Sequence, residues 1–153
     1  MTRKDQLKIY EEYGIKNIDS FDYQLPFQTS MSNKNKKGMY YELACSFDIE
    51  TTTLRRGDKN LESKAFMYKW MCAIENQVVF GDYWEEFIEF CNRLQQENYL
   101  SENLRLVFYV HNLAFEFQFM RNFFTITESF FRKERKPLYF LISQGIEFRC
   151  SYF

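Results

Sequence analysis

The pattern of apolar and polar positions predicts a series of strands between residues 39 and 152. Met39 to Phe47 is rich in aromatic and apolar side chains and is expected to form the first strand. Turn signals at Gly57-Asp58, Glu75-Asn76 and Gln144-Gly145 separate the apolar runs. Further strands are expected at 65–74, 77–80, 104–110, 138–143 and 146–152. The first three strands should pair as an antiparallel meander.

Two stretches have helical periodicity instead. Asp82 and Glu85 predict a capping box at the start of a helix. Its apolar stripe recurs at three- and four-residue spacing, at Trp84, Phe87, Ile88, Cys91 and Leu94. A second helix is expected from residue 114 to residue 124. Strands with intervening helices predict an α/β fold with a mixed sheet. In that sheet the run 104–110 should be buried on both faces, apart from Arg105.

The first 38 residues are polar and of mixed charge. Ile9, Tyr10, Tyr13 and Ile15 favour a short amphipathic helix, and the rest is expected to be loop and a lysine-rich connector. We interpret residues 1–38 as an N-terminal extension and residues 39–153 as one domain. The chain ends at Phe153 inside an apolar run, so this domain is expected to be incomplete at its C-terminus.

Composition excludes a disordered chain, because aromatic residues make up 20% of the 153 positions. A formal net charge of −1 gives no overall signature of nucleic-acid binding. Basic residues nevertheless gather late in the chain, which favours either a phosphate-guiding surface or a solvated loop. They are Arg121, Arg132, Lys133, Arg135, Lys136 and Arg149.

The cysteines and the apolar runs bear on the cellular setting. Cys45, Cys72 and Cys91 lie in apolar runs and are expected to be buried free thiols. No C-x-x-C pair is present, so a zinc site is not expected. No apolar run approaches the ~20 residues of a membrane span, which favours a cytoplasmic protein with no membrane partner.

Candidate chemistry begins with Asp48 and Glu50, which follow the first predicted strand. Side chains alternate along a strand, so both carboxylates share one face. Two neighbouring carboxylates repel each other unless a cation lies between them, and Mg²⁺ prefers oxygen ligands of this kind. The sequence therefore predicts a metal site, with a solvated strand end as the alternative.

A second polar motif follows the strand expected at 104–110. It reads His111-Asn112-Leu113-Ala114-Phe115-Glu116 and crosses from a strand end into a helix. Ligands of open α/β sheets bind outside the carboxyl ends of strands. If the two strands are parallel neighbours, Asn112 and Glu116 come close to Asp48 and Glu50. Four residues apart, Asn112 and Glu116 are expected to share one side of the helix.

These two motifs resemble those of a known family. Phe47-Asp48-Ile49-Glu50-Thr51-Thr52-Thr53 resembles the first exonuclease motif of family B DNA polymerases, and His111 to Glu116 resembles the second. Their combination is most similar to the protein-primed branch, from bacteriophages and mobile elements. The resemblance covers residues 40–153. It implies a ribonuclease H-like fold of the DEDD exonuclease type, in the N-terminal proofreading portion of a phage-like DNA-directed DNA polymerase in the host cytoplasm.

The resemblance also implies roles for particular residues. Two Mg²⁺ or Mn²⁺ ions would bridge the 3′-terminal phosphate of single-stranded DNA and support 3′–5′ hydrolysis. Partners would be single-stranded DNA, a terminal protein primer and the polymerase portion. The implied catalytic metal ligands are Asp48, Glu50 and Glu116, and the implied DNA contacts are Thr51, His111, Asn112, Phe115, Phe119 and Ser151. As alternatives, Phe115 and Phe119 are core residues and His111 is a hydrogen-bonded structural residue.

The sequence departs from the family pattern in two ways. Glu116 stands where the family usually has aspartate, and no aspartate follows Asp82, so the fourth carboxylate is missing. Glu128, Glu134 and Glu147 match it in charge alone. We therefore expect weak or no exonuclease activity from this chain by itself. The rival interpretations are a non-catalytic single-strand-binding or polymerase-interacting protein, an RNA nuclease of the same fold, and an aromatic-rich module with an accidental acidic motif.

Overall fold

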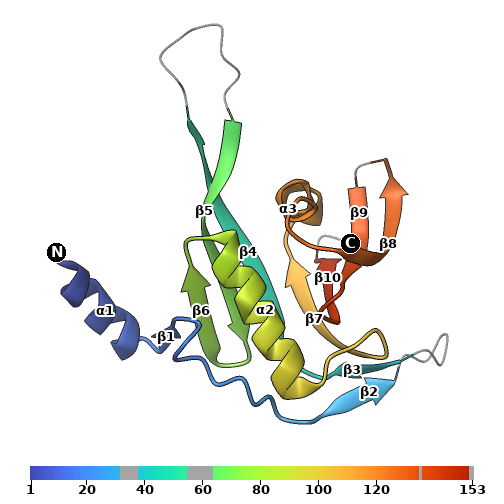
Figure 1. Ribbon diagram of the computed structural model, residues 1–153, viewed down its shortest axis with the longest axis horizontal. Helices are drawn as coiled ribbons and strands as arrows, with labels where there is room; N and C mark the ends of the chain where they lie inside the picture. The colour runs from blue at the N-terminus through green and yellow to red at the C-terminus, as the bar shows by residue number, and fades with distance from the viewer. Residues whose placement is uncertain (32–37, 55–63, 135, 152–153) are drawn as a thin grey trace, which may run out of the picture.

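The computed structural model describes residues 1–31, 38–54, 64–134 and 136–151. Within these ranges the protein is α/β, with helices flanking a mixed sheet (Figure 1). The helices are α1 (Arg3–Glu12), α2 (Trp84–Asn98) and α3 (Leu113–Met120). The strands are β1 (Ile15–Lys16), β2 (Thr29–Met31), β3 (Met39–Tyr41), β4 (Cys45–Leu54), β5 (Lys64–Ile74), β6 (Gln77–Gly81), β7 (Leu104–Val110), β8 (Ile126–Lys133), β9 (Lys136–Ile142) and β10 (Ile146–Cys150).

The main sheet has the strand order β1-β6-β5-β4-β7-β10-β9-β8. The predicted meander of β4, β5 and β6 is confirmed. Beside it, β7 runs parallel to β4 and β10 runs parallel to β7, while β9 pairs antiparallel with both β10 and β8. The strands β4, β7, β10 and β8 therefore point the same way. We call the edge where they end the carboxyl edge; it lies beside α3 in Figure 1.

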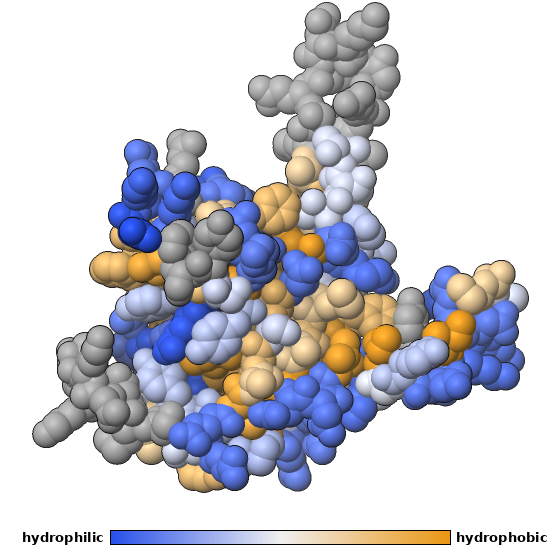
Figure 2. All heavy atoms as spheres, turned by 180° about the vertical axis from the view of Figure 1, so that it is seen from behind, coloured by the Kyte–Doolittle hydropathy of each residue, from blue (hydrophilic) through white to orange (hydrophobic). Residues whose placement is uncertain are grey.

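The core lies between the sheet and α2. On β4, Phe47 and Ile49 are buried, and Phe47 stacks on Phe87 of α2 with ring centroids 4.6 Å apart. Trp70 of β5 packs against the same ring at 5.0 Å. The predicted stripe of α2 is confirmed as core-facing, with the buried Phe90 added to it. The intervening residues of β4, including Asp48, point to the opposite face of the sheet, which we call the rear face (Figure 2).

Several predicted boundaries are wrong. The first strand does not end at Phe47, because β4 continues through the acidic residues to Leu54; the expected turn at Gly57-Asp58 lies outside the described residues. Helix α2 begins one residue later than the predicted capping box. Glu86, not Glu85, accepts hydrogen bonds from the backbone N–H groups of Asp82 (2.8 Å) and Tyr83 (3.0 Å).

The region after α3 also differs from the prediction. Helix α3 ends at Met120, and β8 follows where no strand was expected. Strand β9 begins at Lys136 and includes Pro137, which pairs with Phe131 of β8. The described pairing of β9 with β10 starts only at Tyr139, so Pro137 removes no ladder hydrogen bond from that side.

The predicted burial of β7 is wrong at two residues. Tyr109 is 45% exposed, and the buried residue that was expected to be the exception is Arg105. It lies on the rear face with 7% of its surface exposed. Its guanidinium donates to Glu147 (2.8 Å) and Glu128 (2.6 Å), and its Nε donates to the carbonyl of Glu102 (2.7 Å). A buried charge is tolerated when it is paired and hydrogen-bonded in this way. Glu147 also pairs with Arg149.

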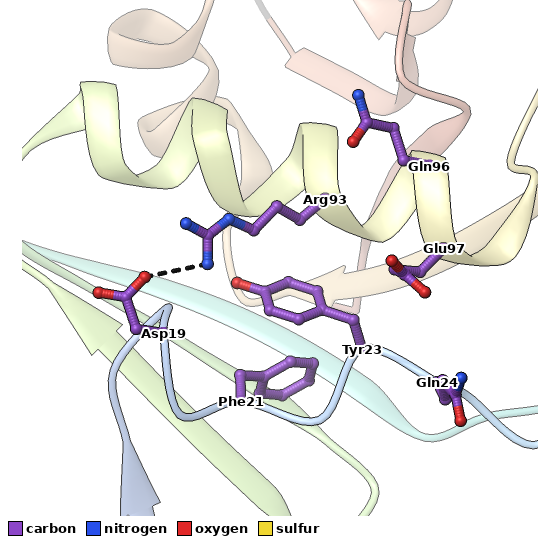
Figure 3. Close-up of a pocket in the computed structure, with 7 residues that line it drawn as sticks. All are labelled: Asp19, Phe21, Tyr23, Gln24, Arg93, Gln96 and Glu97. Carbon is purple, nitrogen blue, oxygen red and sulfur yellow. Dashed lines mark hydrogen bonds and ion pairs between the residues drawn. The ribbon is translucent and has the colours of Figure 1, made fainter.

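The N-terminal extension packs on the rest of the molecule. Strand β1 adds to the edge of the sheet beside β6, and Ile18 and Phe21 belong to the core. A cavity of about 360 Å³ lies where this segment meets α2 (Figure 3). It is lined by Asp19, Phe21, Tyr23, Gln24, Arg93, Gln96 and Glu97.

Arg93 of α2 holds this junction together. Its guanidinium donates to the Ile18 carbonyl (3.1 Å) and Asp19 (3.0 Å) of the N-terminal segment, and to Glu89 (2.8 Å) of its own helix. The guanidinium carbon also lies 5.8 Å from the ring centroid of Tyr23. All three hydrogen bonds are intramolecular, so we interpret Arg93 as a structural clamp.

Replacing Arg93 by Met is therefore expected to loosen the N-terminal segment without unfolding the sheet. The side chain is 35% exposed, so the loss should be modest, about 1 kcal/mol in the free energy of unfolding. Hydrogen exchange at the backbone amides of residues 17–24 should accelerate, while exchange in β7 stays unchanged. Equal acceleration in both regions would contradict a local clamp.

Candidate metal centre

Asp48 and Glu116 meet at the carboxyl edge. Ser46 of β4 pairs with Tyr109 of β7, so the prediction that these strands are parallel neighbours is confirmed. Strand β7 ends at Val110, while β4 continues past this point and carries Asp48 beyond it. Helix α3 starts just after β7, and Glu116 in its first turn forms a hydrogen bond with Asp48.

The surroundings of Glu116 favour its neutral form. Its side chain is only 3% exposed, and its Oε2 atom is buried without a hydrogen-bond partner in the described structure. Burial, the negative charge of Asp48 and the hydrogen bond with Asp48 together raise the pKa of Glu116 to about 7. Near neutral pH Glu116 is therefore close to the midpoint of its titration.

Glu50 and Thr51 flank an irregularity in the sheet. Glu50 is exposed on the same face as Asp48 and pairs in register with Lys69 of β5. The register shifts between Glu50 and Thr51, and such bulges re-aim side chains and bend strands next to binding sites. Lys69, which sequence reasoning missed, directs its ammonium group to Asp82 at 2.9 Å. Its position opposite Glu50 follows from the meander register.

Asn112 lies before α3, not on it. It is the residue preceding the helix and has a left-handed backbone, with φ of 55° and ψ of 61°. Asparagine tolerates this conformation better than most residues, because its short polar side chain bonds locally. The expected shared helix face of Asn112 and Glu116 is therefore wrong, since Asn112 is exposed and Glu116 is buried. His111 is exposed at the end of β7.

The two candidate stacking residues differ in exposure. Phe115 is 42% exposed, whereas Phe119 packs partly against the core. Their rings touch edge-to-face, with centroids 5.3 Å apart. Ser151 lies at the same edge, because its backbone N–H donates to the carbonyl of Val110 at 2.9 Å. The fold thus brings residues from β4, β7, α3 and the end of β10 to one edge of the sheet.

The residues at this edge fit a divalent cation in part. Asp48 and Glu116 offer hard oxygen ligands. The Oε2 atom of Glu116, which has no hydrogen-bond partner in the described structure, is available to coordinate a cation. In the described part of the chain, no group of three or more His, Cys, Asp or Glu residues is arranged to hold a metal ion. Glu128 and Glu147 contribute nothing here, because both are paired with Arg105.

Comparison with known proteins identifies no relative. A scan against protein-family models, a search of curated proteins and a search of solved structures all return no match. None of the described helices is long and apolar enough to cross a membrane.

Proposed function

We propose that this chain is a metal-dependent nuclease module of ribonuclease H-like fold. Specifically, we propose the 3′–5′ exonuclease portion of a protein-primed, phage-like DNA polymerase, acting on single-stranded DNA ends in the host cytoplasm. The observation that carries the proposal is the contact between Asp48 and Glu116 at the carboxyl edge, with an unsatisfied buried oxygen on Glu116. A protein core rarely leaves such an atom without a partner, and a cation between the carboxylates would supply one.

The residues at the edge would divide the work as follows. Asp48 and Glu116, with Glu50 beside them, would hold Mg²⁺ or Mn²⁺. The bound metal would activate water and stabilise the charge that develops on the phosphate. The exposed ring of Phe115 is available for base or sugar stacking, while Thr51, His111, Asn112 and Ser151 would contact the terminal nucleotides. A terminal protein primer and a polymerase portion are the partners that the family resemblance implies.

Metal binding is the first test. Mn²⁺ or Mg²⁺ should raise the melting temperature of the wild-type chain, because a ligand that binds only the folded state stabilises it. Asp48→Asn should lower the metal affinity at least tenfold, an order-of-magnitude expectation for losing one charged ligand. Glu42→Gln, which changes an exposed carboxylate preceding β4, is the matched control and should leave the affinity unchanged. Equal metal shifts in both variants would count against a site at Asp48.

Hydrolysis is the second test. A single-stranded DNA labelled at its 3′ end is incubated with the chain and Mg²⁺ or Mn²⁺, alongside the Asp48→Ala/Glu50→Ala variant. We expect slow digestion that this variant abolishes, since no aspartate follows Asp82 to complete the family's carboxylate set. Digestion that persists in the variant would refute the assignment of these carboxylates.

A second candidate is a non-catalytic single-strand-binding protein of the same fold. It is favoured by one observation, the engagement of Glu128 and Glu147 with Arg105, which leaves neither to replace the missing aspartate. Binding of single strands that ignores added metal and survives Asp48→Ala, with no digestion at all, would favour this candidate.

A further inference from the structure

The register of the sheet places four side chains in one row across the rear face. Phe130 of β8 pairs with Tyr139 of β9, Tyr139 with Arg149 of β10, and Arg149 with Tyr109 of β7. Paired residues of neighbouring strands point to the same face, and the strands lie roughly 4.8 Å apart. We call these four residues the rear row; the face that carries it is the one seen in Figure 2.

The rear row is open to solvent at both ends. Phe130 is 52% exposed and Tyr109 is 45% exposed, while Tyr139 and Arg149 between them are half-buried. The rings of Phe130 and Tyr139 are nearly parallel, with an interplanar angle of 11° and centroids 6.4 Å apart. The guanidinium of Arg149 lies 5.1 Å from the ring centroid of Tyr40. The row therefore sets aromatic rings and a guanidinium group next to one another on one face of the sheet.

Neighbouring carboxylates hold two members of the rear row, Tyr139 and Arg149, in place. The Tyr139 hydroxyl donates to Glu128 (3.0 Å), and the Nε of Arg149 pairs with Glu147. Both carboxylates are in turn held by the buried Arg105. Side chains fixed in this way lose little conformational entropy when a ligand binds, so the surface is pre-organised.

Positive charge lies at the end of the same hairpin. Lys133 and Lys136 pair directly across β8 and β9, and both are exposed. Like charges directly opposite each other destabilise a strand pair, and none of the ion pairs among the described residues includes either lysine. A polyanion would relieve this repulsion. Glu134 in the adjoining turn is the nearest opposing charge in the sequence.

We propose that Phe130, Tyr139 and Arg149, with the lysine pair at the hairpin end, bind an extended single-stranded nucleic acid. Bases would stack on the row, and Lys133 and Lys136 would contact phosphates. The row runs through Tyr109 to Ser46, two residues before Asp48 on the same face of β4. The role of the row in leading a nucleic-acid strand to the metal centre rests on the proposed function. The binding of nucleic acid to the row does not depend on that function.

The test is fluorescence anisotropy of the full chain with labelled oligo-dT or oligo-rU, in EDTA so that no metal takes part. Phe130→Ala should weaken binding about tenfold, the loss of one stacked base. Lys133→Ala/Lys136→Ala should reduce the salt dependence of the affinity by about one to two phosphate contacts. Tyr13→Ala, which removes an aromatic ring that is 74% exposed at the end of α1, is the matched control and should bind as wild type. The two oligonucleotides show whether DNA or RNA is preferred.

Several outcomes of the binding measurements would overturn the proposal. They are no binding by the wild-type chain, unchanged binding by Phe130→Ala, and equal weakening by Phe130→Ala and Tyr13→Ala. If Phe130→Ala instead abolishes only self-association, the row is a protein contact and the proposal is likewise overturned. Asp48→Ala/Glu50→Ala should still bind in EDTA, so failure of the metal centre and failure of the rear row give different results.

Discussion

Replacing Glu116 by Gln is expected to make the metal-free protein more stable at pH 8 and to leave its stability at pH 4 nearly unchanged. In the unfolded chain Glu116 loses its proton near its ordinary pKa of 4.5, but in the folded protein it does so at about 7. Between these pH values the folded state holds a proton that the unfolded state has lost, so rising pH favours unfolding. The contribution of Glu116 to the free energy of unfolding is fully present below pH 4.5 and has been lost above pH 7.

The size of this effect follows from the difference between the two pKa values. A rise from 4.5 to about 7 corresponds to about 3 kcal/mol in the free energy of unfolding. Gln keeps the shape and the hydrogen bond to Asp48 but carries no ionisable proton. The free energy of unfolding of the variant should therefore fall by about 3 kcal/mol less than that of the wild type between pH 4 and pH 8. Urea denaturation from pH 4 to pH 8 in EDTA measures both profiles. Glu42→Gln should follow the wild type, and parallel profiles for Glu116→Gln and wild type would contradict the assignment.

Replacing Arg105 by Met is expected to have the largest effect on stability, a loss of about 3–5 kcal/mol. Glu147 is buried, with 2% of its surface exposed. Of its two cationic partners, Arg105 and Arg149, it would lose Arg105, which is the more deeply buried. Glu128 would lose its ion pair with Arg105 as well. The uncompensated charge, more than the lost contact, accounts for the penalty. Urea denaturation at pH 7 provides the measurement.

Two further variants separate charge from packing at this position. Arg121→Met removes an exposed arginine at the end of α3 and should cost less than about 0.5 kcal/mol. Arg105→Met/Glu147→Leu removes both members of the buried pair, so it should recover a large part of the stability lost in Arg105→Met. If the double variant is as unstable as the sum of the single changes, the loss arises from packing and not from an unpaired charge.

The part of the candidate site that sequence reasoning reached rests on two local rules. Alternation places Asp48 and Glu50 on one face, and a strand followed directly by a helix places Glu116 at a strand end. The parallel pairing of β4 with β7 then brings Asp48 and Glu116 together. What local rules did not supply is the burial of Glu116, which depends on how α3 packs on the sheet.

Other features depend on residues far apart in the chain. Arg105 looks like a surface residue by alternation, and its burial becomes acceptable through carboxylates far along the chain, such as Glu147, 42 positions later. Strand β8 was missed because its exposed residues show no clean alternation; its pairing with β9 defines it. The rear row is likewise invisible in the sequence, because its members come from four strands whose order is set by topology.

The four cysteines give this fold a built-in reporter of opening. Cys45, Cys72, Cys91 and Cys150 are all buried free thiols, carried by β4, β5, α2 and β10. Burial raises the pKa of Cys45 to about 12 and that of Cys72 and Cys91 well above the ordinary range, which suppresses the reactive thiolate. Alkylating reagents can therefore modify these thiols only when the sheet or α2 opens. The order in which the four sites are labelled would map local opening across the native protein without any introduced probe.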